Sequence, residues 1–429
     1  MKHFIQKILR VYARLLLKKY KPRVIGITGS VGKTSAKQAV LVVLADQYRV
    51  RGTIKNYNNE IGVPLTIIGM KSGGRSLVRW FRIFTRATWM LIKRDQNFPE
   101  LLILEMGADR PGDIAYLMEM APVDVGVITA IGEAHYEYFK DIKSIKQEKG
   151  MMVTSLSEDG VSILNVDNDH AASLVSQVKG RVVTYGFSSD AMVQASDVSI
   201  AYQELNGRSF PTGVHFKIAH EGATVPVFLP GVLGSPHMLA ALAGVAVGVA
   251  HGMNLIQIAE TLRKFEPPCG RMRILRGIKE TVILDDTYNA SPLAMIMALD
   301  AMREIELNDG ARRYAVLGDM LELGNITRGA HEDIGHRLQA FNVDFLITVG
   351  EAAKYIAEAA SAHGFDDDQI VRFDDADSAG RFLQEKIHPG DVMLFKGSQG
   401  IRLEKAVLEV MGEPLKSDRL LCRQDETWS

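Results

Sequence analysis

The feature that most constrains the fold is a series of short apolar runs, rich in β-branched residues. Each run is followed by a turn and a stretch of helical periodicity. The runs cover residues 24–27, 101–104, 125–129, 182–185, 282–284, 314–317, 345–349 and 392–395. Continuous apolar strands that alternate with helices are typical of parallel sheets covered on both faces. The sequence therefore predicts an α/β fold with functional residues directly after the strands, because ligands collect at the carboxyl ends of parallel strands.

The 429 residues suffice for two or three domains at about 150 residues each. Two prolines and a glycine within 265–270 break the pattern, and a new strand–helix alternation then runs to residue 411. Between 186 and 230 apolar and polar residues alternate, which predicts an antiparallel edge of the sheet or a small β subdomain. We expect a basic helix at 1–21, a central domain at 22–268, a C-terminal domain at 269–411 and a polar, frayed tail at 412–429.

Charge and cysteine content exclude several classes of protein. With 50 Lys and Arg against 51 Asp and Glu, the chain is not built mainly to neutralise nucleic-acid phosphates. Its two cysteines, Cys269 and Cys422, rule out a disulfide scaffold or a zinc ribbon and indicate a reducing compartment. No apolar run reaches the roughly 18–20 residues of a spanning helix, and the basic start is unlike a signal peptide. These features predict a cytoplasmic protein.

Two segments, residues 1–23 and 75–94, contain no acidic residue and place apolar residues among Lys and Arg at helical spacing. The second also carries Trp80, Phe81, Phe84 and Trp89. Basic amphipathic helices of this kind suit an anionic membrane surface or an acidic ligand. They also occur as helices that pack on the protein body with a solvated charged face, and the sequence leaves both interpretations open.

A phosphate-binding loop is predicted directly after the first apolar strand. Residues 28–35 read TGSVGKTS and lead into a helix. Glycines let backbone N–H groups close around phosphate oxygens, the helix N-terminus attracts anions, Lys33 reaches the terminal phosphates and Thr34 offers an oxygen to Mg²⁺. The general pattern has glycine where this chain has Ile27. The candidate ATP-binding residues here are Thr28, Gly29, Ser30, Val31, Gly32, Lys33, Thr34 and Ser35.

Several further blocks, together with this loop, resemble the Mur ligase family. They lie in family order between residues 22 and 411: NYNNEIGVPLT at 56–66, EMGA at 105–108, PGDI at 111–114, AHYE at 134–137, KG at 149–150, GRM at 270–272, DDTYNASP at 285–292, GDMLELG at 318–324 and KGS at 396–398. The resemblance implies a central phosphate-loop ATPase domain with a mostly parallel sheet, followed by a Rossmann-like C-terminal α/β domain.

The resemblance also implies an activity, that of an ATP-dependent, ADP-forming amide ligase of peptidoglycan precursor synthesis. The 56–66 and 285–292 blocks resemble those of members that join D-alanyl-D-alanine to a UDP-N-acetylmuramoyl tripeptide through an acyl phosphate. Such members carry a further amino-terminal domain for the UDP end, which this sequence is expected to lack. The basic segments would then hold the substrate's diphosphate or dock the enzyme at the inner face of a membrane. A ligase for another carboxylate and amine, or a non-catalytic nucleotide-responsive membrane adaptor, remain alternatives.

Two metal sites are predicted, because an anionic triphosphate and a carboxylate repel each other unless cations neutralise them. Glu105 ends the strand 101–104, where it can share a Mg²⁺ with Thr34, and His135 follows the strand 125–129, where it can hold a second ion. The resemblance implies that Lys149 is carbamylated and completes this second site. Each of these residues also has a structural interpretation. Glu105 would be a helix-capping or surface acid, His135 a core histidine and Lys149 a solvated helix lysine.

The remaining predicted roles come from the resemblance. It implies that Arg271 moves onto the ATP phosphates when the domains close, and that Asp286 accepts from the ribose hydroxyls. Tyr288 and Asn289 would lie near the nucleotide, and His237 aligns with an asparagine that contacts adenine. Lys396 and Ser398 follow the strand 392–395, where they would face the amine substrate, and Asn58 and Asn59 are further substrate candidates. The predicted catalytic residues are Lys33, His135, Lys149, Arg271 and Lys396.

Overall fold

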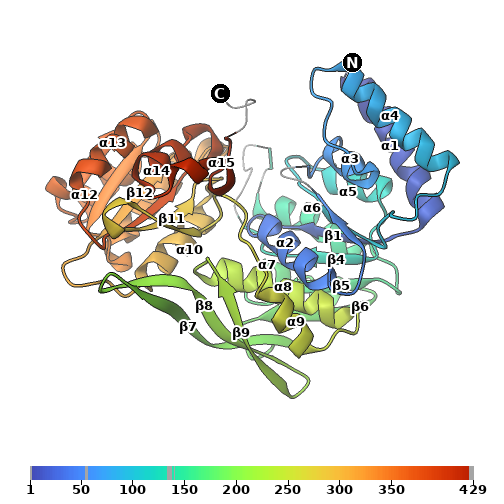
Figure 1. Cartoon of the computed structure of the whole chain (residues 1–429), viewed down its shortest axis with the longest axis horizontal. Coiled ribbons are helices and arrows are strands. Elements are labelled where there is room, and N and C mark those ends of the chain that lie inside the picture. The colour runs from blue at the N-terminus through green and yellow to red at the C-terminus, as the bar shows by residue number, and fades with distance from the viewer. Residues whose placement is uncertain (1, 54–56, 133–137, 140, 425–429) are drawn as a thin grey trace.

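The computed structural model describes residues 2–53, 57–132, 138–139 and 141–424, which form two lobes built around two sheets (Figure 1). We call the part around the nine-stranded sheet the first lobe and the part around the six-stranded sheet the second lobe. The α/β fold predicted from the apolar runs is confirmed. His135 lies outside the described residues, so the structure does not place this predicted metal ligand.

The first sheet is parallel from β2 to β7 and ends in antiparallel strands. Its order is β2-β3-β1-β4-β5-β6-β7-β8-β9. Between residues 186 and 230 the structure has the antiparallel strands β7 to β9, which extend this sheet at its edge and do not form a separate subdomain. The strands are β1 (Arg23–Thr28), β2 (Val50–Gly52), β3 (Leu101–Glu105), β4 (Val125–Ile128), β5 (Val161–Asn165), β6 (Arg181–Gly186), β7 (Val193–Leu205), β8 (Arg208–His220) and β9 (Ala223–Pro230).

Helices cover both faces of this sheet because successive strand residues point to opposite faces and both sets are apolar. Ile25 and Ile103 face the core under α2, α8 and α9, whereas Val24 and Leu102 face the core under α1, α3, α4, α5 and α6. The helices are α1 (Lys2–Tyr20), α2 (Lys33–Leu44), α3 (Gly62–Ile68), α4 (Leu77–Ile92), α5 (Asp113–Met120), α6 (Ile142–Thr154), α7 (Asp169–Ala172), α8 (Ser235–Ala250) and α9 (Leu255–Leu262).

The second sheet has the order β10-β11-β15-β12-β13-β14 and is parallel except for the β10–β11 pair. Its helices α10, α11 and α12 pack on one face, and α13 and α14 on the other. The strands are β10 (Arg273–Arg276), β11 (Val282–Asp286), β12 (Arg313–Gly318), β13 (Phe345–Val349), β14 (Ile370–Phe373) and β15 (Val392–Lys396). The helices are α10 (Pro292–Arg303), α11 (Thr327–Arg337), α12 (Lys354–Ala362), α13 (Ala376–Lys386), α14 (Glu404–Val410) and α15 (Ser417–Leu420).

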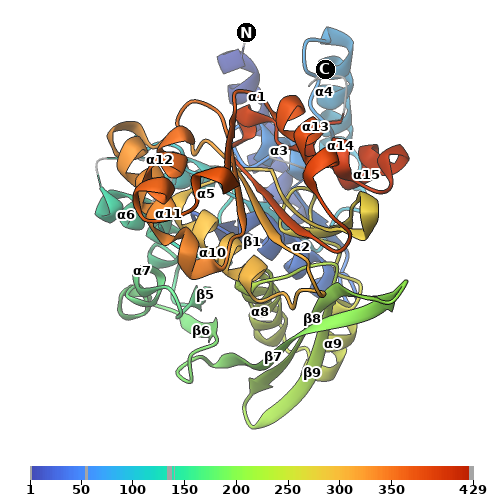
Figure 2. The same cartoon turned by 90° about the vertical axis from the view of Figure 1, so that its left-hand side faces the viewer.

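The long β7–β8 hairpin of the first lobe reaches under the second lobe (Figure 2). The Asn206 side chain at its turn donates to Glu280 Oε1 at 2.5 Å. The Ser209 backbone N–H donates to Asn308 Oδ1 at 2.8 Å, and Asn308 Nδ2 donates back to the Ser209 carbonyl at 3.0 Å. The two lobes are therefore joined at this hairpin as well as by the chain segment between α9 and β10.

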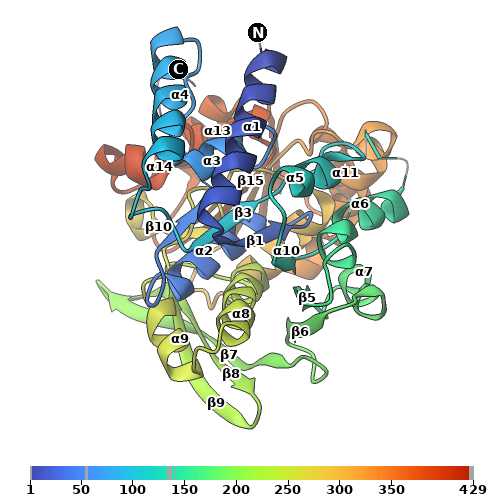
Figure 3. The same ribbon diagram turned by 90° about the vertical axis from the view of Figure 1, so that its right-hand side faces the viewer.

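The two basic segments form helices, as the sequence predicted. These helices, α1 and α4, lie side by side at one edge of the first lobe (Figure 3). The Tyr12 hydroxyl lies 2.6 Å from Thr88 Oγ1, and Lys19 Nζ donates to the carbonyls of Met90 and Leu91 at the end of α4. Within the described part of the chain, no helix has the length and apolar content needed to cross a bilayer.

The C-terminal residues up to Gln424 differ from the frayed tail expected from the sequence. They form a short 3-10 helix and α15, and Leu421 and Cys422 are buried. Arg423 forms an ion pair with Glu404, whose carboxylate is fully buried. The polar composition suggested fraying because apolar residues in this segment are few, but a buried ion pair holds the segment together with those few apolar residues.

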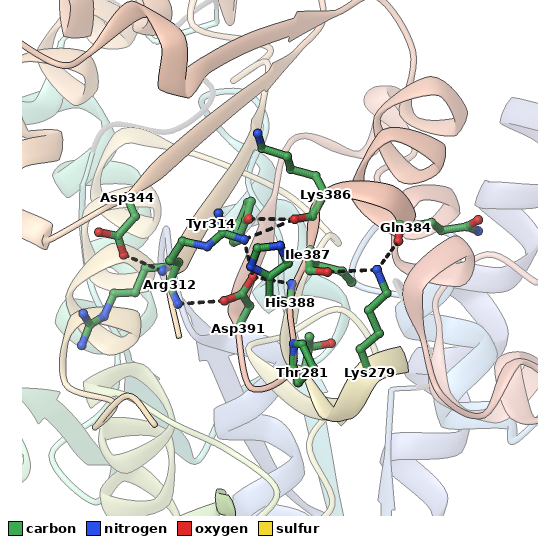
Figure 4. A network of polar contacts seen from close by, with 12 residues as sticks. Lys279, Thr281, Arg312, Tyr314, Asp344, Gln384, Lys386, Ile387, His388 and Asp391 are labelled. Atoms are coloured by element: carbon green, nitrogen blue, oxygen red, sulfur yellow. Dashed lines mark hydrogen bonds and ion pairs between the residues drawn. The ribbon is translucent and has the colours of Figure 1, made fainter. Parts of the chain in front are cut away.

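A buried carboxylate fixes the turn that leads into β15 (Figure 4). Asp391 is fully buried and accepts from the backbone N–H groups of Arg312 and His388, both at 2.8 Å, and from Arg312 Nη2 at 3.1 Å. The carbonyl of Lys386 accepts from Arg312 Nη2 and from the Tyr314 hydroxyl. The network ties the start of β12 to the start of β15, whose far end carries Lys396.

We expect Asp391→Ala to lower the free energy of unfolding by about 3 kcal/mol, because it leaves the Arg312 charge and two backbone donors without their partner. Urea unfolding of both proteins measures the difference. The matched control is Asp333→Ala, which removes an exposed ion pair with Arg337 and should cost less than about 1 kcal/mol. Equal, small losses in the two variants would contradict this account of Asp391.

Candidate active site

The predicted phosphate loop connects β1 to α2 with the geometry that an anion site requires. Gly29 has φ +150° and lies so close to β4 that a Cβ atom would fall 2.0 Å from Thr129 Oγ1. Gly32, with φ +86°, precedes the first residue of α2, and no side chain caps that helix end. Thr129 Oγ1 donates to the Val31 carbonyl at 2.6 Å. The N-terminus of α2 is thus open to a phosphate, and β4 holds the loop in shape.

Lys33 curls back over this loop. Its Nζ donates to the Gly29 carbonyl at 2.7 Å. Burial lowers the pKa of Lys33, and the Glu105 carboxylate partly offsets this effect. A buried ammonium held at the loop is placed to meet the charge of a bound phosphate, which would replace the carbonyl as its partner.

Glu105, at the end of β3, meets Thr34 at the start of α2. Thr34 Oγ1 and Asn58 Nδ2 each lie 3.3 Å from Glu105 Oε1. Lys37 Nζ lies 3.7 Å from Glu105 Oε2, which is buried and has no hydrogen-bond partner. A carboxylate, a hydroxyl and an amide fit the oxygen ligands that Mg²⁺ prefers beside substrate phosphates. The structure thus brings the predicted ligands Thr34 and Glu105 together, with Asn58 beside them.

Lys149 lies on α6 with its side chain turned into the protein, at 1% exposure. Burial, and to a smaller extent the Lys33 charge, lower its pKa to about 7, although the Asp109 carboxylate partly offsets these effects. The preceding residue, Glu148, anchors α6 by accepting from the backbone N–H groups of Gly112 and Ile114 at 2.8 and 2.7 Å. Since a fraction of the Lys149 amine is neutral near pH 7, this lysine is not a solvated helix lysine.

The second lobe supplies Arg271. Its guanidinium carbon lies 4.1 Å from the centre of the Tyr288 ring, and its Nε is buried without a hydrogen-bond partner. The Arg271 charge lowers the pKa of both Lys33 and Lys37. A small cavity of about 70 Å³ joins Arg271 to the phosphate loop and to residues 289–291, which include Asn289. Arg271, Tyr288 and Asn289 therefore face the phosphate loop across the gap between the lobes.

Asp286 and Lys396 lie opposite each other on the paired strands β11 and β15. Lys396 Nζ donates to Asp286 Oδ2 at 2.5 Å and to the Asn289 carbonyl at 3.1 Å. Ser398 Oγ accepts from the Leu321 backbone N–H at 2.9 Å, and Lys396 and Ser398 are both buried. In this structure these two side chains bond within the second lobe, and their contact with an amine substrate stays a prediction.

His237 is buried at the junction of the lobes. It lies 2.6 Å from the Arg271 carbonyl through Nε2, and its Nδ1 has no partner. Because the carbonyl only accepts, Nε2 carries the proton. Burial lowers the pKa of His237 to about 4, so the ring is neutral at physiological pH. Its predicted contact with adenine stays a prediction, as does substrate binding by Asn59.

Two residues of this site, Lys37 and Thr129, were not predicted from the sequence. Lys37 lies one helical turn after Lys33 on α2, and its i,i+4 spacing is the signal that could have shown it beside Glu105. Thr129, which holds the phosphate loop, ends a predicted strand, but only the pairing of β4 with β1 brings it to Gly29. In the part of the chain that the structure describes, no group of three acidic, His or Cys side chains could hold a metal.

A cavity of about 950 Å³ lies beside these residues between the lobes. One wall comes from α2 and the segment 57–72, a second from the connecting segment 266–273, and a third from the C-terminal residues 418–424. The lining residues that bear on the site are Thr34, Lys37, Asn59, Arg271, Tyr288 and Arg423. The cavity is large enough for extended substrates that approach the phosphate loop.

A phosphate loop in one α/β lobe, facing an arginine from a second α/β lobe across a cleft, defines a nucleotide-dependent two-lobed enzyme. Residues 27–78 and 87–247 match the Mur ligase middle domain, and residues 270–399 match the Mur ligase glutamate ligase domain. The chain belongs to the Mur ligase family and is an ATP-dependent, ADP-forming ligase.

Curated relatives and solved structures agree with this assignment. The UDP-N-acetylmuramoyl-tripeptide–D-alanyl-D-alanine ligase of Bacillus subtilis is 31% identical over 95% of this chain and 80% of the relative. The enzyme of the same name from Mycobacterium tuberculosis is 33% identical over 89% of this chain and 71% of the relative. The structure of MurF ligase from Thermotoga maritima in complex with ADP has the same fold, with TM-score 0.76 and 24% identity over 96% of this chain and 84% of that one.

Proposed function

We propose that this chain joins D-alanyl-D-alanine to a UDP-N-acetylmuramoyl tripeptide at the expense of ATP, as its relatives' names state for them. The observation that carries the proposal is the convergence of Lys33, Thr34 and Glu105 at the phosphate loop opposite Arg271. We also propose that residues 22–268 form the nucleotide domain and residues 269–411 the domain that closes over it.

The chemistry follows from the charges at this site. A carboxylate oxygen of the tripeptide attacks the γ-phosphorus of ATP, the bond to the β-phosphate oxygen breaks, and ADP leaves. The amino group of the dipeptide then attacks the acyl phosphate and expels inorganic phosphate. Lys33 and Arg271 interact with the phosphoryl group from opposite lobes and stabilise its negative charge during transfer. Thr34 and Glu105 would hold a Mg²⁺, which neutralises charge on the phosphates.

The nucleotide's other contacts are proposed on the second lobe. Each carboxylate oxygen of Asp286 has a partner, Met272 N–H on one and Lys396 on the other. Each oxygen keeps a further lone pair, so Asp286 can still accept from ribose hydroxyls. The Lys396 ammonium fixes this carboxylate in place. His237 lines a small cavity together with Asp286 and Lys396, and Tyr288 and Asn289 follow Asp286 on the loop after β11.

We expect purified protein to release phosphate from ATP only when both the tripeptide substrate and D-alanyl-D-alanine are present. Lys33→Met should reduce this rate more than 100-fold, because it removes the cation that meets the transferring phosphoryl group. Lys405→Met, which removes an exposed ion pair with Asp377, is the control and should leave the rate unchanged. Phosphate release that depends on neither substrate would contradict the proposal. Release that requires a different acid and amine would mean that the enzyme is a ligase with other substrates.

We further propose that Lys149 is carbamylated and, with His135, holds a second Mg²⁺. Support comes from its position: a buried amine on α6 within electrostatic reach of Lys33 and without the exposed setting of an ordinary lysine. Reaction of the neutral amine with CO₂ gives an N-carboxylate and a proton. The product is an anion that would balance the charge of Lys33 and supply oxygen ligands.

Under this proposal Lys149→Ala should lose at least 100-fold in turnover, and a short carboxylate such as acetate or propionate should restore part of it by occupying the vacated space. Bicarbonate alone should restore nothing, since the amine is absent. Lys143→Ala, an exposed lysine on the same helix, is the control and should behave as wild type with or without carboxylates. A fully active Lys149→Ala enzyme would remove the second metal site as proposed.

Finally, we propose that α1 and α4 dock on an anionic membrane at its cytoplasmic face. Large apolar side chains on α4 point to solvent, among them Phe81 at 68% and Ile92 at 81% exposure, while Arg79, Arg82 and Arg86 lie on the same acid-free helix. Phe4, Val11 and Leu15 of α1 are also exposed. A diphosphate ligand would account for the basic residues but not for the exposed apolar ones, so a lipid surface suits the pair better.

Sedimentation with vesicles tests this proposal. We expect wild type to bind vesicles of phosphatidylglycerol and phosphatidylcholine and to be released by high salt. Phe81→Glu combined with Ile92→Glu should weaken binding at least tenfold, because it replaces apolar contacts with charges that the vesicle repels. Leu415→Glu, which changes an apolar residue that is 98% exposed on another part of the molecule, is the matched control. Wild type that stays in solution would end this proposal.

A further inference from the structure

The C-terminal residues 421–424 form part of the wall of the large cavity between the lobes, next to the nucleotide-facing residues of the second lobe. Leu421 and Cys422 are buried, and Cys422 packs so closely on the connecting segment that a Cβ on Gly270 would lie 2.4 Å from its sulfur. These residues therefore lie at the site, although their sequence shows none of the family's blocks.

Arg423 fixes this segment through a buried carboxylate. Its Nη2 donates to Glu404 Oε2 at 2.6 Å and its Nε to Glu404 Oε1 at 3.0 Å, and Glu404 is fully buried. Arg402 also donates to Glu404 Oε1, at 2.5 Å. A bidentate arginine–carboxylate contact fixes the direction as well as the distance between the two groups, so the Arg423 guanidinium is held in one orientation.

The same guanidinium also holds the loop after β11. Arg423 Nη2 donates to the Thr287 carbonyl at 2.7 Å and Nη1 to the Tyr288 carbonyl at 3.3 Å. The Tyr288 backbone N–H in turn donates to the Gly270 carbonyl at 3.0 Å. The backbone of Tyr288 is thus held from both sides, which fixes the point from which its ring extends toward Arg271.

The Tyr288 ring supports Arg271, whose guanidinium carbon lies 4.1 Å from the ring centre. Because Nε of Arg271 is buried without a hydrogen-bond partner, this ring contact is a main constraint on the guanidinium. We propose that Arg423 is a positioning residue for Arg271. By fixing Tyr288, it holds the Arg271 charge toward the phosphate loop before the nucleotide arrives. The inference rests on the proposed function, in which Arg271 acts on ATP phosphates.

Titration with a non-hydrolysable ATP analogue and Mg²⁺ tests the inference, since this readout needs neither the acid nor the amine substrate. Arg271→Met should weaken analogue binding about tenfold, and Arg423→Met should weaken it about fivefold or more. The double variant should bind no worse than Arg271→Met within a factor of two, because Arg423 acts through Arg271. Lys416→Met, an exposed residue of the same C-terminal segment outside the cavity lining, is the control and should bind as wild type.

A purely structural role for Arg423 predicts different results. Arg423→Lys keeps a cation beside Glu404 but has no planar fork to reach the two carbonyls as well. We expect it to restore most of the melting temperature lost in Arg423→Met while analogue binding stays weakened. Three results would each overturn the inference. The first is a loss of affinity in the double variant equal to the product of the two single losses. The second is unchanged binding in Arg423→Met or Arg271→Met, and the third is full recovery of binding in Arg423→Lys. If wild type binds the analogue as expected but ligates nothing, the proposed function fails and the inference does not.

Discussion

The parallel pairing of β1 with β3 determines the rest of the site. The register places Ile27 opposite Glu105, so the carboxylate comes directly beside the loop that β1 feeds into α2. A buried acid next to a cluster of backbone N–H groups and two lysines gives a site where opposite charges meet with little water between them. Lys37 forms an ion pair with Glu105, and Thr34 lies at hydrogen-bonding distance from the same carboxylate. The contacts that stabilise the first lobe therefore also prepare it for a charged nucleotide.

The sequence predicted the α/β class, the phosphate loop and the meeting of Thr34 with Glu105, because these depend on short-range signals and on the rule that strand ends share an edge. It did not predict that Lys396 and Asp286 form an ion pair, since that depends on which strands of the second sheet are neighbours. β15 is inserted between β11 and β12, an arrangement that apolar runs alone do not encode. The order of the strands was beyond the sequence, and so were four strands that none of the predicted runs covers, β2, β5, β10 and β14.

The C-terminal segment shows a second limit. Its polar composition predicted a frayed tail, yet Arg423 is held by Glu404 and packs against the loop after β11. Composition reports the apolar area that a segment can bury, whereas this segment is held by a buried charge pair, which only the fold creates, in addition to buried Leu421 and Cys422. A positioning role for such a residue is invisible to motif comparison, because the residue belongs to no motif and touches the family's arginine only through Tyr288.

The hairpin β7–β8 restricts how the lobes can move. The second lobe is attached to the first through the chain between α9 and β10 and also through the hairpin turn at Asn206 and Ser209. A rotation that keeps both attachments intact must have its axis along the line joining them, since any other axis would stretch one of the two. Arg271 lies in the connecting segment itself, so a rotation about that line would move it along a shorter path than the outer helices α12 and α13.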